Sequence, residues 1–405
     1  MAQRFILNGT SYHGAGAIQE IATEAKAHGF QKAFVCSDPD LIKFGVTKKV
    51  LKVLDDNGFS YELYSNIKPN PTIENVQTGV EAFKNAGTDY LIAIGGGSSM
   101  DTAKAIGIII NNPEFADVRS LEGVADTKNP AVPIIAVPTT AGTAAEVTIN
   151  YVITDAEKNR KMVCVDPHDI PVVAVVDPDM MSSMPKGLTA ASGIDAVTHA
   201  LEAYASMMAT EYTDGLAIEA LKNIFEYLPR AYDDGLNDPV AREKMANAAT
   251  MAGMAFANAF LGVCHSMAHK LGAYHHLPHG VANALMIDYV LEFNAAEVPA
   301  KMGTFSQYDY PKTLRRYAQV AEALGVSGRN DEAKLKGLIK KIDDLKEYVG
   351  IKKTIKDYGV DEKYFLDTLD QMTEDAFDDQ CTGANPRLPL MSEIKDMYLR
   401  AYYGK

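Results

Sequence analysis

The chain has 405 residues, 47% hydrophobic and 23% charged, a composition that is typical of folded globular domains and excludes a largely disordered chain. Its formal net charge of -14 argues against a nucleic-acid partner, because phosphate backbones are bound by clustered lysine and arginine. The four cysteines are scattered without a Cys-x-x-Cys pair, and the N-terminus lacks an apolar signal segment. These features predict a reduced, cytoplasmic protein.

Short apolar runs alternate with helical segments in the first half of the chain. The runs lie at residues 32–36, 90–94, 132–137 and 172–176, and the clearest helical segments at 17–28 and 47–57. This alternation predicts an α/β fold with a mostly parallel sheet and helices on both faces. Because such sheets bind ligands at the carboxyl ends of their strands, the turns that follow the strands are candidate binding segments.

A glycine-rich turn, Gly-Gly-Gly-Ser-Ser-Met-Asp at residues 95–101, follows one of these strands and leads into a helical segment at 102–110. Backbone N–H groups and the helix dipole at such a turn favour a phosphate. An ordinary strand-to-helix turn capped by Ser98 or Asp101 explains the motif equally well by itself. The motif is not the dinucleotide fingerprint G-x-G-x-x-G, so it does not name the ligand.

Two further turns carry polar groups after strands. Pro-Thr-Thr-Ala-Gly-Thr at residues 138–143 offers three hydroxyls beside a glycine, although a plain turn would contain the same residues. Asp38 follows the strand at 32–36, where a carboxylate can accept hydrogen bonds from a ribose and repel a 2′-phosphate. A solvated turn residue is the alternative, and Asp40 could share the role.

Beyond Pro185 and Gly187 strand signals disappear and helical periodicity dominates. The predicted helices cover residues 188–206, 212–227, 240–271, 281–293, 314–324 and 332–349. We therefore expect an α/β domain over residues 1–185 and an all-α domain over 186–405. The uncharged stretch 245–264 is long enough to span a membrane, but it is rich in Ala and Gly and contains Asn247 and Asn258, so we interpret it as a buried helix.

Histidine is concentrated in one segment of the second half, with five of the nine histidines between residues 265 and 279. His265 and His269 are four residues apart and share a helix face, whereas His279 follows Pro278 at the start of the next helix. The clustering predicts either a metal site or proton transfer, because imidazole serves both. The two remaining histidines, His275 and His276, are expected in a solvated loop.

A second pair, Asp195 and His199, has the same spacing of four residues on a predicted helix. By itself such a pair is more often a cap or a surface pair than a metal site. Together with the histidine cluster it makes a plausible set for a divalent first-row metal, in which one carboxylate and several imidazoles bind the ion.

Asp195, His199, His265 and His279 resemble the metal-binding quartet of the iron-dependent (group III) alcohol dehydrogenases. The resemblance runs from Phe-Ile-Leu-Asn at residues 5–8 to Cys-Thr-Gly-Ala-Asn-Pro-Arg at 381–387, essentially the whole chain. Residues 106–108, 112–123 and 139–155 look most like members that interconvert lactaldehyde and 1,2-propanediol. Residues 303–309 and 376–381 look more like the alcohol dehydrogenase half of bifunctional members.

The resemblance implies a nicotinamide cofactor, with NAD favoured, and Fe²⁺, with Zn²⁺ as an alternative metal. It also implies residues that line the cofactor cleft, the glycine-rich turn holding the pyrophosphate. The positions that match are Asp38, Asn70, Gly96, Gly97, Ser98, Asp101, Thr139, Thr140, Thr143, Asn150 and Lys161.

Three further residues are candidates near the reacting atoms, two from the resemblance and His269 from its position one helical turn beyond His265. Phe256 and Cys381 match the substrate pocket, although core packing and a structural cysteine explain them at least as well. His269 is the best candidate for a proton relay, and hydrogen bonding to a metal ligand is an equal alternative. We expect catalysis in a cleft between the domains, with the metal acting as a Lewis acid.

The expected protein is thus a homodimeric, NAD-linked oxidoreductase of short primary alcohols or diols, neither membrane-bound nor bound to nucleic acid. Lactaldehyde and 1,2-propanediol are the first candidate pair, and an ethanol or butanol dehydrogenase is the alternative. A metal-dependent hydrolase would not need the two strand-end loops. A polyol dehydrogenase or dehydroquinate-synthase-like lyase would usually have a different ligand set, and an assembly protein is suggested only because bifunctional relatives form filaments.

Overall fold

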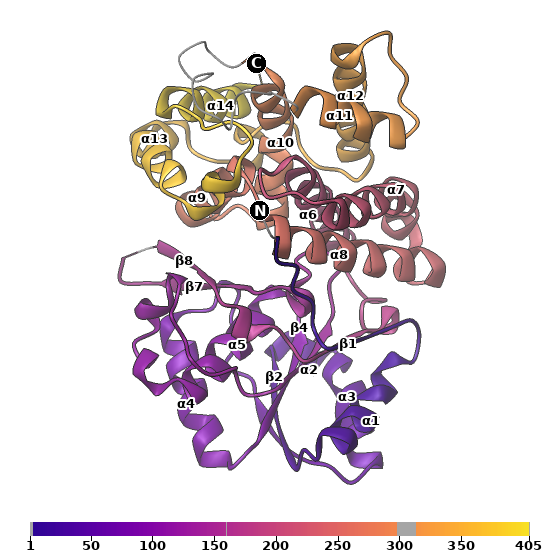
Figure 1. Cartoon of the computed structure of the whole chain (residues 1–405), viewed down its shortest axis with the longest axis vertical. Coiled ribbons are helices and arrows are strands. Elements are labelled where there is room, and N and C mark those ends of the chain that lie inside the picture. Colours follow the sequence, from indigo (N-terminus) through magenta and orange to yellow (C-terminus); the bar gives the residue numbers. More distant parts are fainter. Residues whose placement is uncertain (1–2, 159, 298–312, 405) are drawn as a thin grey trace. The chain divides into compact units, whose positions relative to one another are not determined.

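The protein is described by a computed structural model that covers residues 3–158, 160–297 and 313–404 (Figure 1). These residues form two compact units. The sheet unit comprises Phe5–Met184 and Gly235–Gly253, and the helical unit consists mainly of Pro185–Asp234 and the described residues from Met254 onward. The division into functional domains at residues 185 and 186 stays a prediction, and the compact units differ from it mainly in residues 235–253. The stretch 303–309 lies outside the described residues.

The sheet unit is built on six parallel strands in the order β1-β9-β6-β4-β2-β3. This confirms the predicted α/β fold with a parallel sheet. The strands are β1 (Thr10–His13), β2 (Lys32–Ser37), β3 (Ser60–Tyr64), β4 (Tyr90–Gly95), β6 (Ile134–Pro138) and β9 (Val173–Val176). The strand order reverses between β2 and β4, because β3 lies on one side of β2 and all later strands lie on the other.

Helices cover both faces of this sheet (Figure 1). Successive side chains of a strand point to opposite faces, so each strand contributes to two clusters. Phe34 and Leu91 pack with residues of α4 and α5, while Val35 and Ile92 pack with residues of α1 and α3 on the other face. The apolar runs read from the sequence are therefore strands buried on both sides. The helices are α1 (Glu20–His28), α2 (Pro39–Lys43), α3 (Val46–Asp56), α4 (Ile73–Ala86) and α5 (Gly97–Asn111).

A second, three-stranded sheet in this unit was not predicted. It has the order β5-β8-β7, with β5 at Gly123–Val124, β7 at Asn150–Asp155 and β8 at Arg160–Val165. The antiparallel pair β7 and β8 places Thr154 opposite Lys161. Buried and half-buried residues alternate along β7, so this sheet lacks the continuous apolar run that marks the main strands.

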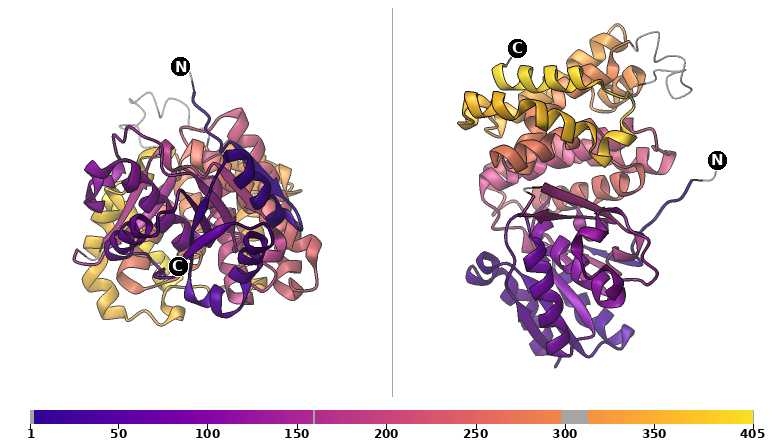
Figure 2. Two further views of the ribbon diagram at one scale, coloured as in Figure 1. Left: turned by 90° about the horizontal axis from the view of Figure 1, so that it is seen from below. Right: turned by 90° about the vertical axis from the view of Figure 1, so that its left-hand side faces the viewer.

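The helical unit contains only helices and connecting segments among its described residues, which confirms the predicted all-α character. Its helices α13 and α14 lie side by side (Figure 1 and the right-hand view of Figure 2). Neither was predicted. The helices from α6 onward are α6 (Lys186–Ala205), α7 (Glu211–Asp234), α8 (Pro239–Ala259), α9 (Val263–His275), α10 (His279–Ala295), α11 (Thr313–Ala323), α12 (Asp331–Tyr348), α13 (Glu362–Phe377) and α14 (Met391–Tyr403). The first part of α8, up to Gly253, belongs to the sheet unit.

The predicted helix over residues 240–271 is wrong, because the chain breaks between α8 and α9. Phe260 has a left-handed φ of 61°, and the first N–H groups of α9 are satisfied by distant side chains. Asn385 accepts a hydrogen bond from the N–H of Val263 (3.1 Å), and Glu202 accepts one from Cys264 (2.8 Å). Such caps cannot be read from local sequence. Among the described residues no single helix could cross a membrane, although the bent pair α8 and α9 passes by length and composition.

The end of α9 also differs from the prediction. The helix continues past Gly272 to His275, and His276 ends it in the left-handed conformation with a φ of 56°. His275 is half-buried rather than solvated: its Nε2 lies 3.3 Å from the hydroxyl of Thr368, and its ring meets Tyr364 edge-on.

A buried lysine holds the segment that leads into β7. Lys104, on α5, is fully buried and donates hydrogen bonds to the carbonyl oxygens of Thr148 (2.6 Å) and Asn150 (2.9 Å). Its ammonium group also lies 3.6 Å from the buried carboxyl of Asp169. Burial raises the pKa of Asp169 to about 8, and the positive charge of Lys104 acts in the opposite direction by stabilising the ionised carboxylate.

We predict that Lys104→Met lowers the thermal stability markedly. Removing one partner from a buried polar cluster costs about 3–5 kcal/mol, because the remaining groups stay dehydrated and unpaired. Lys52→Met is the matched control, since Lys52 is 69% exposed and pairs with Asp56 one turn away, an interaction worth about 0–1 kcal/mol. Equal melting temperatures for the two variants in a calorimetric scan would contradict the role given to Lys104.

Candidate functional site

Helix α6 presents three chemically active side chains on one face. Asp195, His199 and Glu202 follow one another at intervals of four and three residues, the spacing that places side chains above each other on a helix. All three are buried, with exposed fractions of 2%, 3% and 4%. A helix that buries two carboxyl groups and an imidazole needs compensating partners on its neighbours.

Two neighbouring helices supply these partners. His265 is the third residue of α9, and His279 is the first residue of α10. The start of α10 lies directly against α6, because a Cβ added at Gly280 would come closer than 3.0 Å to the carbonyl oxygen of Ala191. Only glycine permits this approach, which holds His279 over the face of α6.

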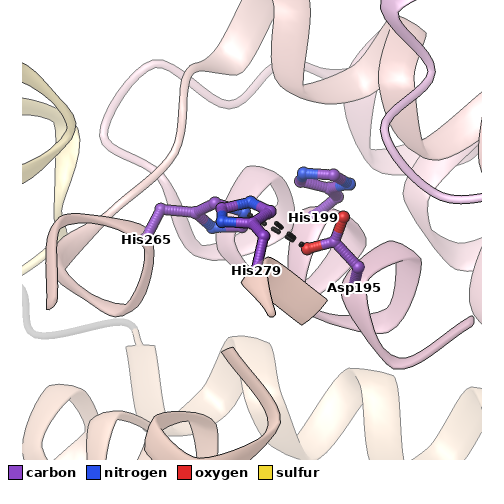
Figure 3. Close-up of side chains that lie close together, drawn as sticks. All are labelled: Asp195, His199, His265 and His279. Atoms are coloured by element: carbon purple, nitrogen blue, oxygen red, sulfur yellow. Dashed lines mark ion pairs between the residues drawn. The ribbon is translucent and has the colours of Figure 1, made fainter. Parts of the chain in front are cut away.

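The predicted quartet converges in the structure (Figure 3). One ligand atom each from Asp195, His199, His265 and His279 lie within 4.8 Å of one another. The Oδ1 atom of Asp195 is 3.5 Å from Nε2 of His279 and 3.8 Å from Nε2 of His265. A tetrahedral ion with bonds of about 2.0–2.2 Å separates its ligand atoms by about 3.3–3.6 Å, so the observed spacing fits a first-row divalent metal.

The protonation states of the quartet also suit a metal. Burial lowers the pKa of His265 to about 3, so its ring is neutral at neutral pH, as metal binding requires. Burial by itself would raise the pKa of Asp195, but the charges of His199, His279 and His265 outweigh it and hold the pKa below its usual value. The site therefore offers one anionic oxygen and, at His265, a neutral imidazole nitrogen.

Two residues that support the quartet were missed from the sequence. Oε2 of Glu202 lies 2.5 Å from Nδ1 of His265, which directs Nε2 of the same ring toward the other ligand atoms. Asn283 donates from Nδ2 to Oδ1 of Asp195 (2.7 Å) and lies 3.0 Å from Nε2 of His265. Helical spacing could have indicated both, because Glu202 is seven residues after Asp195 and Asn283 is four after His279.

The other predicted residues of the helical unit lie beside the quartet. The ring of Phe256 stacks on His199 with 4.4 Å between centroids, and the ring of His269 stacks on His279 at 5.5 Å. Nδ1 of His269 is 3.1 Å from a carboxylate oxygen of Asp379. Cys381 is buried with His269 and Asp379 in a second group of potential ligand atoms, and Lys270 Nζ lies 2.9 Å from the same Asp379 oxygen.

In the sheet unit, the two loops predicted to bind the cofactor touch each other. They follow adjacent strands, and the N–H of Thr139 donates to the carbonyl oxygen of Gly95 (3.0 Å). A Cβ added at Gly96 would lie 3.2 Å from Oγ1 of Thr140, and one at Gly97 would lie 3.3 Å from Cγ2 of Thr143. Ser98 follows in the first turn of α5, whose free N–H groups face this edge of the sheet.

Asp38 lies at the carboxyl end of β2, next to β4, where the strand order reverses. This is the position at which open α/β sheets bind ligands. Its carboxylate is already used in part, because it accepts hydrogen bonds from the N–H groups of Asp40 and Leu41 (both 2.9 Å) and caps α2.

The remaining predicted cofactor residues, which are Asn70, Asp101, Asn150 and Lys161, lie on or beside the strands β7 and β8. Asn70 has a left-handed φ of 54°, and the carbonyl of the following Pro71 accepts a hydrogen bond from Thr154 in β7 (2.7 Å). Burial raises the pKa of Asp101 to about 7, with Lys104 and Lys161 acting in the opposite direction. Asn150 begins β7, and its buried Oδ1 accepts no hydrogen bond from a described residue.

Comparison with known families matches almost the whole chain. Residues 8–178 match the model of iron-containing alcohol dehydrogenases, and residues 189–402 match the C-terminal model of the same family. The chain belongs to the iron-containing alcohol dehydrogenase family. It is therefore an oxidoreductase that interconverts alcohols and aldehydes, and the resemblance drawn from the sequence is confirmed.

Several relatives of this alcohol dehydrogenase cover its full length. Lactaldehyde reductase of Escherichia coli is 46% identical over 99% of the chain and 100% of that protein. A bifunctional aldehyde-alcohol dehydrogenase of the same organism is 44% identical over 97% of the chain and 46% of that protein. An NADPH-dependent butanol dehydrogenase of Clostridium saccharobutylicum is 38% identical over 99% of the chain and 98% of that protein.

Solved structures of the family share the fold. A 1,3-propanediol oxidoreductase is 35% identical and superposes with a TM-score of 0.90 over 99% of the chain and 100% of that structure. A sulfoacetaldehyde reductase of Bifidobacterium kashiwanohense in complex with NAD⁺ is 26% identical, with a TM-score of 0.83 over the full length of both chains.

We predict a graded loss of metal affinity across this site. His265→Ala should abolish stable binding, because it removes one of four bonds, whereas Glu202→Gln should weaken binding by about 10–100-fold, the usual effect of changing a group that orients a ligand. Glu146→Gln is the control, as this glutamate is equally buried but lies in the sheet unit. Dissociation constants from chelator competition measure the series, and unchanged affinity in Glu202→Gln would contradict its orienting role.

Proposed function

We propose that this alcohol dehydrogenase interconverts lactaldehyde and 1,2-propanediol with NAD(H) as the cofactor. The observation that carries the proposal is the 46% identity to a lactaldehyde reductase along the full length of both chains. Similarity to a 1,3-propanediol oxidoreductase, whose substrate is also a short diol, supports the same substrate class. A homodimer and a cytoplasmic location are proposed on the family resemblance alone.

We assign Asp195, His199, His265 and His279 as the ligands of a divalent metal, with Fe²⁺ as the first candidate. The donor set of one carboxylate and three imidazoles suits Fe²⁺ and also accepts Zn²⁺, so metal supply in the cell decides between them. His279 is the most open of the four, with 33% of its side chain exposed, and its side of the quartet is where a substrate could approach.

The chain's own residues bind and orient the reactants and move the proton. A bound metal would polarise the substrate oxygen, and the nicotinamide would supply or accept the hydride. Glu202 and Asn283 keep His265 and Asp195 in the orientation that the ion requires. We assign proton transfer to His269, because its ring stacks on the exposed ligand His279 and its Nδ1 is held by Asp379.

The cofactor role proposed for the sheet unit rests on three segments at one edge of the sheet. The glycine-rich turn would hold the pyrophosphate at the start of α5, the threonine loop would line the nicotinamide end, and Asp38 would face the adenosine ribose. A relative in complex with NAD⁺ supports NAD, whereas the NADPH-dependent butanol dehydrogenase shows that the family includes both preferences.

We predict that Asp38→Asn reduces the preference for NADH over NADPH by at least about tenfold. The change removes the charge that would repel a 2′-phosphate, yet asparagine is as good a helix cap as aspartate, so α2 keeps its start. Asp38→Gly would also delete the cap and is a poorer test. The measurement is kcat/KM for both cofactors; if Asp38→Asn discriminates as sharply as the parent, Asp40 becomes the better candidate.

We predict that kcat/KM is highest for 1,2-propanediol and lower for ethanol and 1-butanol, with 2-propanol poorest. A branch at the reacting carbon would collide with the nicotinamide ring in a pocket that holds one substrate oxygen at the metal. The assay measures kcat/KM of the metal-loaded enzyme for each of these four alcohols. Ethanol or 1-butanol far ahead of the diol would support the alternative ethanol or butanol dehydrogenase, and a preference for 2-propanol would contradict the pocket argument.

A further inference from the structure

The uncharged, Ala- and Gly-rich stretch at residues 245–264 makes a close contact that the metal site does not explain. Its first part belongs to the sheet unit, where α8 packs on the turn after the threonine loop. A Cβ added at Gly253 would come closer than 3.0 Å to the Cβ of Ala144 and would lie 3.2 Å from Cγ2 of Val147. Glycine is therefore the only residue that permits this approach of α8.

The contact is made with a residue in an unfavourable backbone conformation. Ala144 has a left-handed φ of 51°, a conformation that is unfavourable for a residue with a Cβ atom. Such a conformation persists only where neighbouring structure enforces it. Ala144 is 2% exposed and caps the start of the short helix Ala145–Val147, so the enforcement comes from packing that includes Gly253.

A buried hydrogen bond fastens the same turn to α8 one helical turn earlier. Oγ1 of Thr250 lies 2.9 Å from Oε1 of Glu146, and the two residues are 1% and 3% exposed. A carboxyl group so deeply buried needs this partner, because without it no hydrogen bond from Thr250 would compensate for the lost hydration. Gly253 and Thr250 thus hold successive parts of one turn, three residues apart on one face of α8.

The turn is connected directly to the predicted cofactor loops. Thr143 precedes Ala144, and its methyl group packs where a Cβ at Gly97 would lie 3.3 Å away. A displacement of Ala144 therefore moves Thr143 against the glycine-rich turn at the start of α5. We propose that Gly253 is a positioning residue: by letting α8 close on Ala144, it fixes the threonine loop in the conformation that binds the nicotinamide cofactor. This inference rests on the proposed function, because that function assigns the loop to the cofactor.

The first test adds a methyl group to α8 by the substitution Gly253→Ala. Gly253→Ala should weaken NADH binding by at least about tenfold, since the added carbon must displace Ala144 and with it the adjacent Thr143. The matched control is Gly215→Ala, a helical glycine in α7 with open space at its Cβ position. This control should bind NADH as the parent does.

A second substitution makes the steric cause testable. Ala144→Gly removes the atom that the new methyl group would strike and relieves the left-handed strain, so the double variant Gly253→Ala with Ala144→Gly should recover most of the lost affinity. Hydrogen exchange of the peptide 139–147 should rise in Gly253→Ala and fall again in the double variant. If Gly253→Ala does not fold, recovery of folding and NADH binding in the double variant supports the proposal. If the double variant recovers neither folding nor binding, the proposal is overturned.

NADH dissociation constants are measured by fluorescence on the full-length, metal-loaded protein. If the parent binds NADH and Gly253→Ala has the same NADH affinity and the same hydrogen exchange in the peptide 139–147, the positioning role alone is overturned. No binding of NADH or NADPH by the parent overturns the proposed cofactor and the role given to the loop with it. Equal losses in Gly253→Ala and Gly215→Ala would also overturn the proposal, because they would trace the effect to helix composition.

Discussion

The arrangement of the helical unit depends on the burial of one carboxylate, that of Asp195. An ionised carboxyl removed from water is stable only where other groups replace its hydration, and here three helices provide them. His199 comes from the same helix, His265 from α9, and His279 and Asn283 from α10. Each partner constrains the position of its helix, so the charge that a cation would use also defines how α6, α9 and α10 pack.

The sheet unit is organised by a different constraint, the close approach of backbone at one edge of the sheet. The strand order reverses between β2 and β4, and the turns after β4 and β6 meet there through glycine and threonine. The segment between the threonine loop and β7 is held at both ends. Lys104 donates hydrogen bonds to the carbonyl oxygens of Thr148 and Asn150 at its far end, while α8 contacts Ala144 at its near end. The segment between the threonine loop and β7 is thus fixed from two sides by groups that take no part in chemistry.

Much of this could be predicted from the sequence, because the signals were local. The four buried apolar runs were enough to indicate the fold. The spacing of the Asp195 and His199 pair and of the histidine cluster indicated a metal site, and the family resemblance named its four ligands. What could not be predicted depends on residues far apart in the chain. The break before α9 is set by Asn385 and Glu202, and the short sheet of β5, β7 and β8 lacks a continuous apolar run. Helical spacing places Glu202 on the same face as Asp195, but its contact with His265 depends on α9 lying beside α6.

The contact between Gly280 and Ala191 has a consequence for the spacing of the quartet. At this point the backbones of α6 and α10 already touch, so the two helices cannot come closer and the side chains of Asp195 and His279 start from main-chain positions with a fixed minimum separation. One carboxylate and three imidazoles suit a first-row divalent metal, whereas Ca²⁺ takes about six to eight oxygen ligands. A glycine that touches none of the ligand atoms therefore limits how closely these ligands can approach one another.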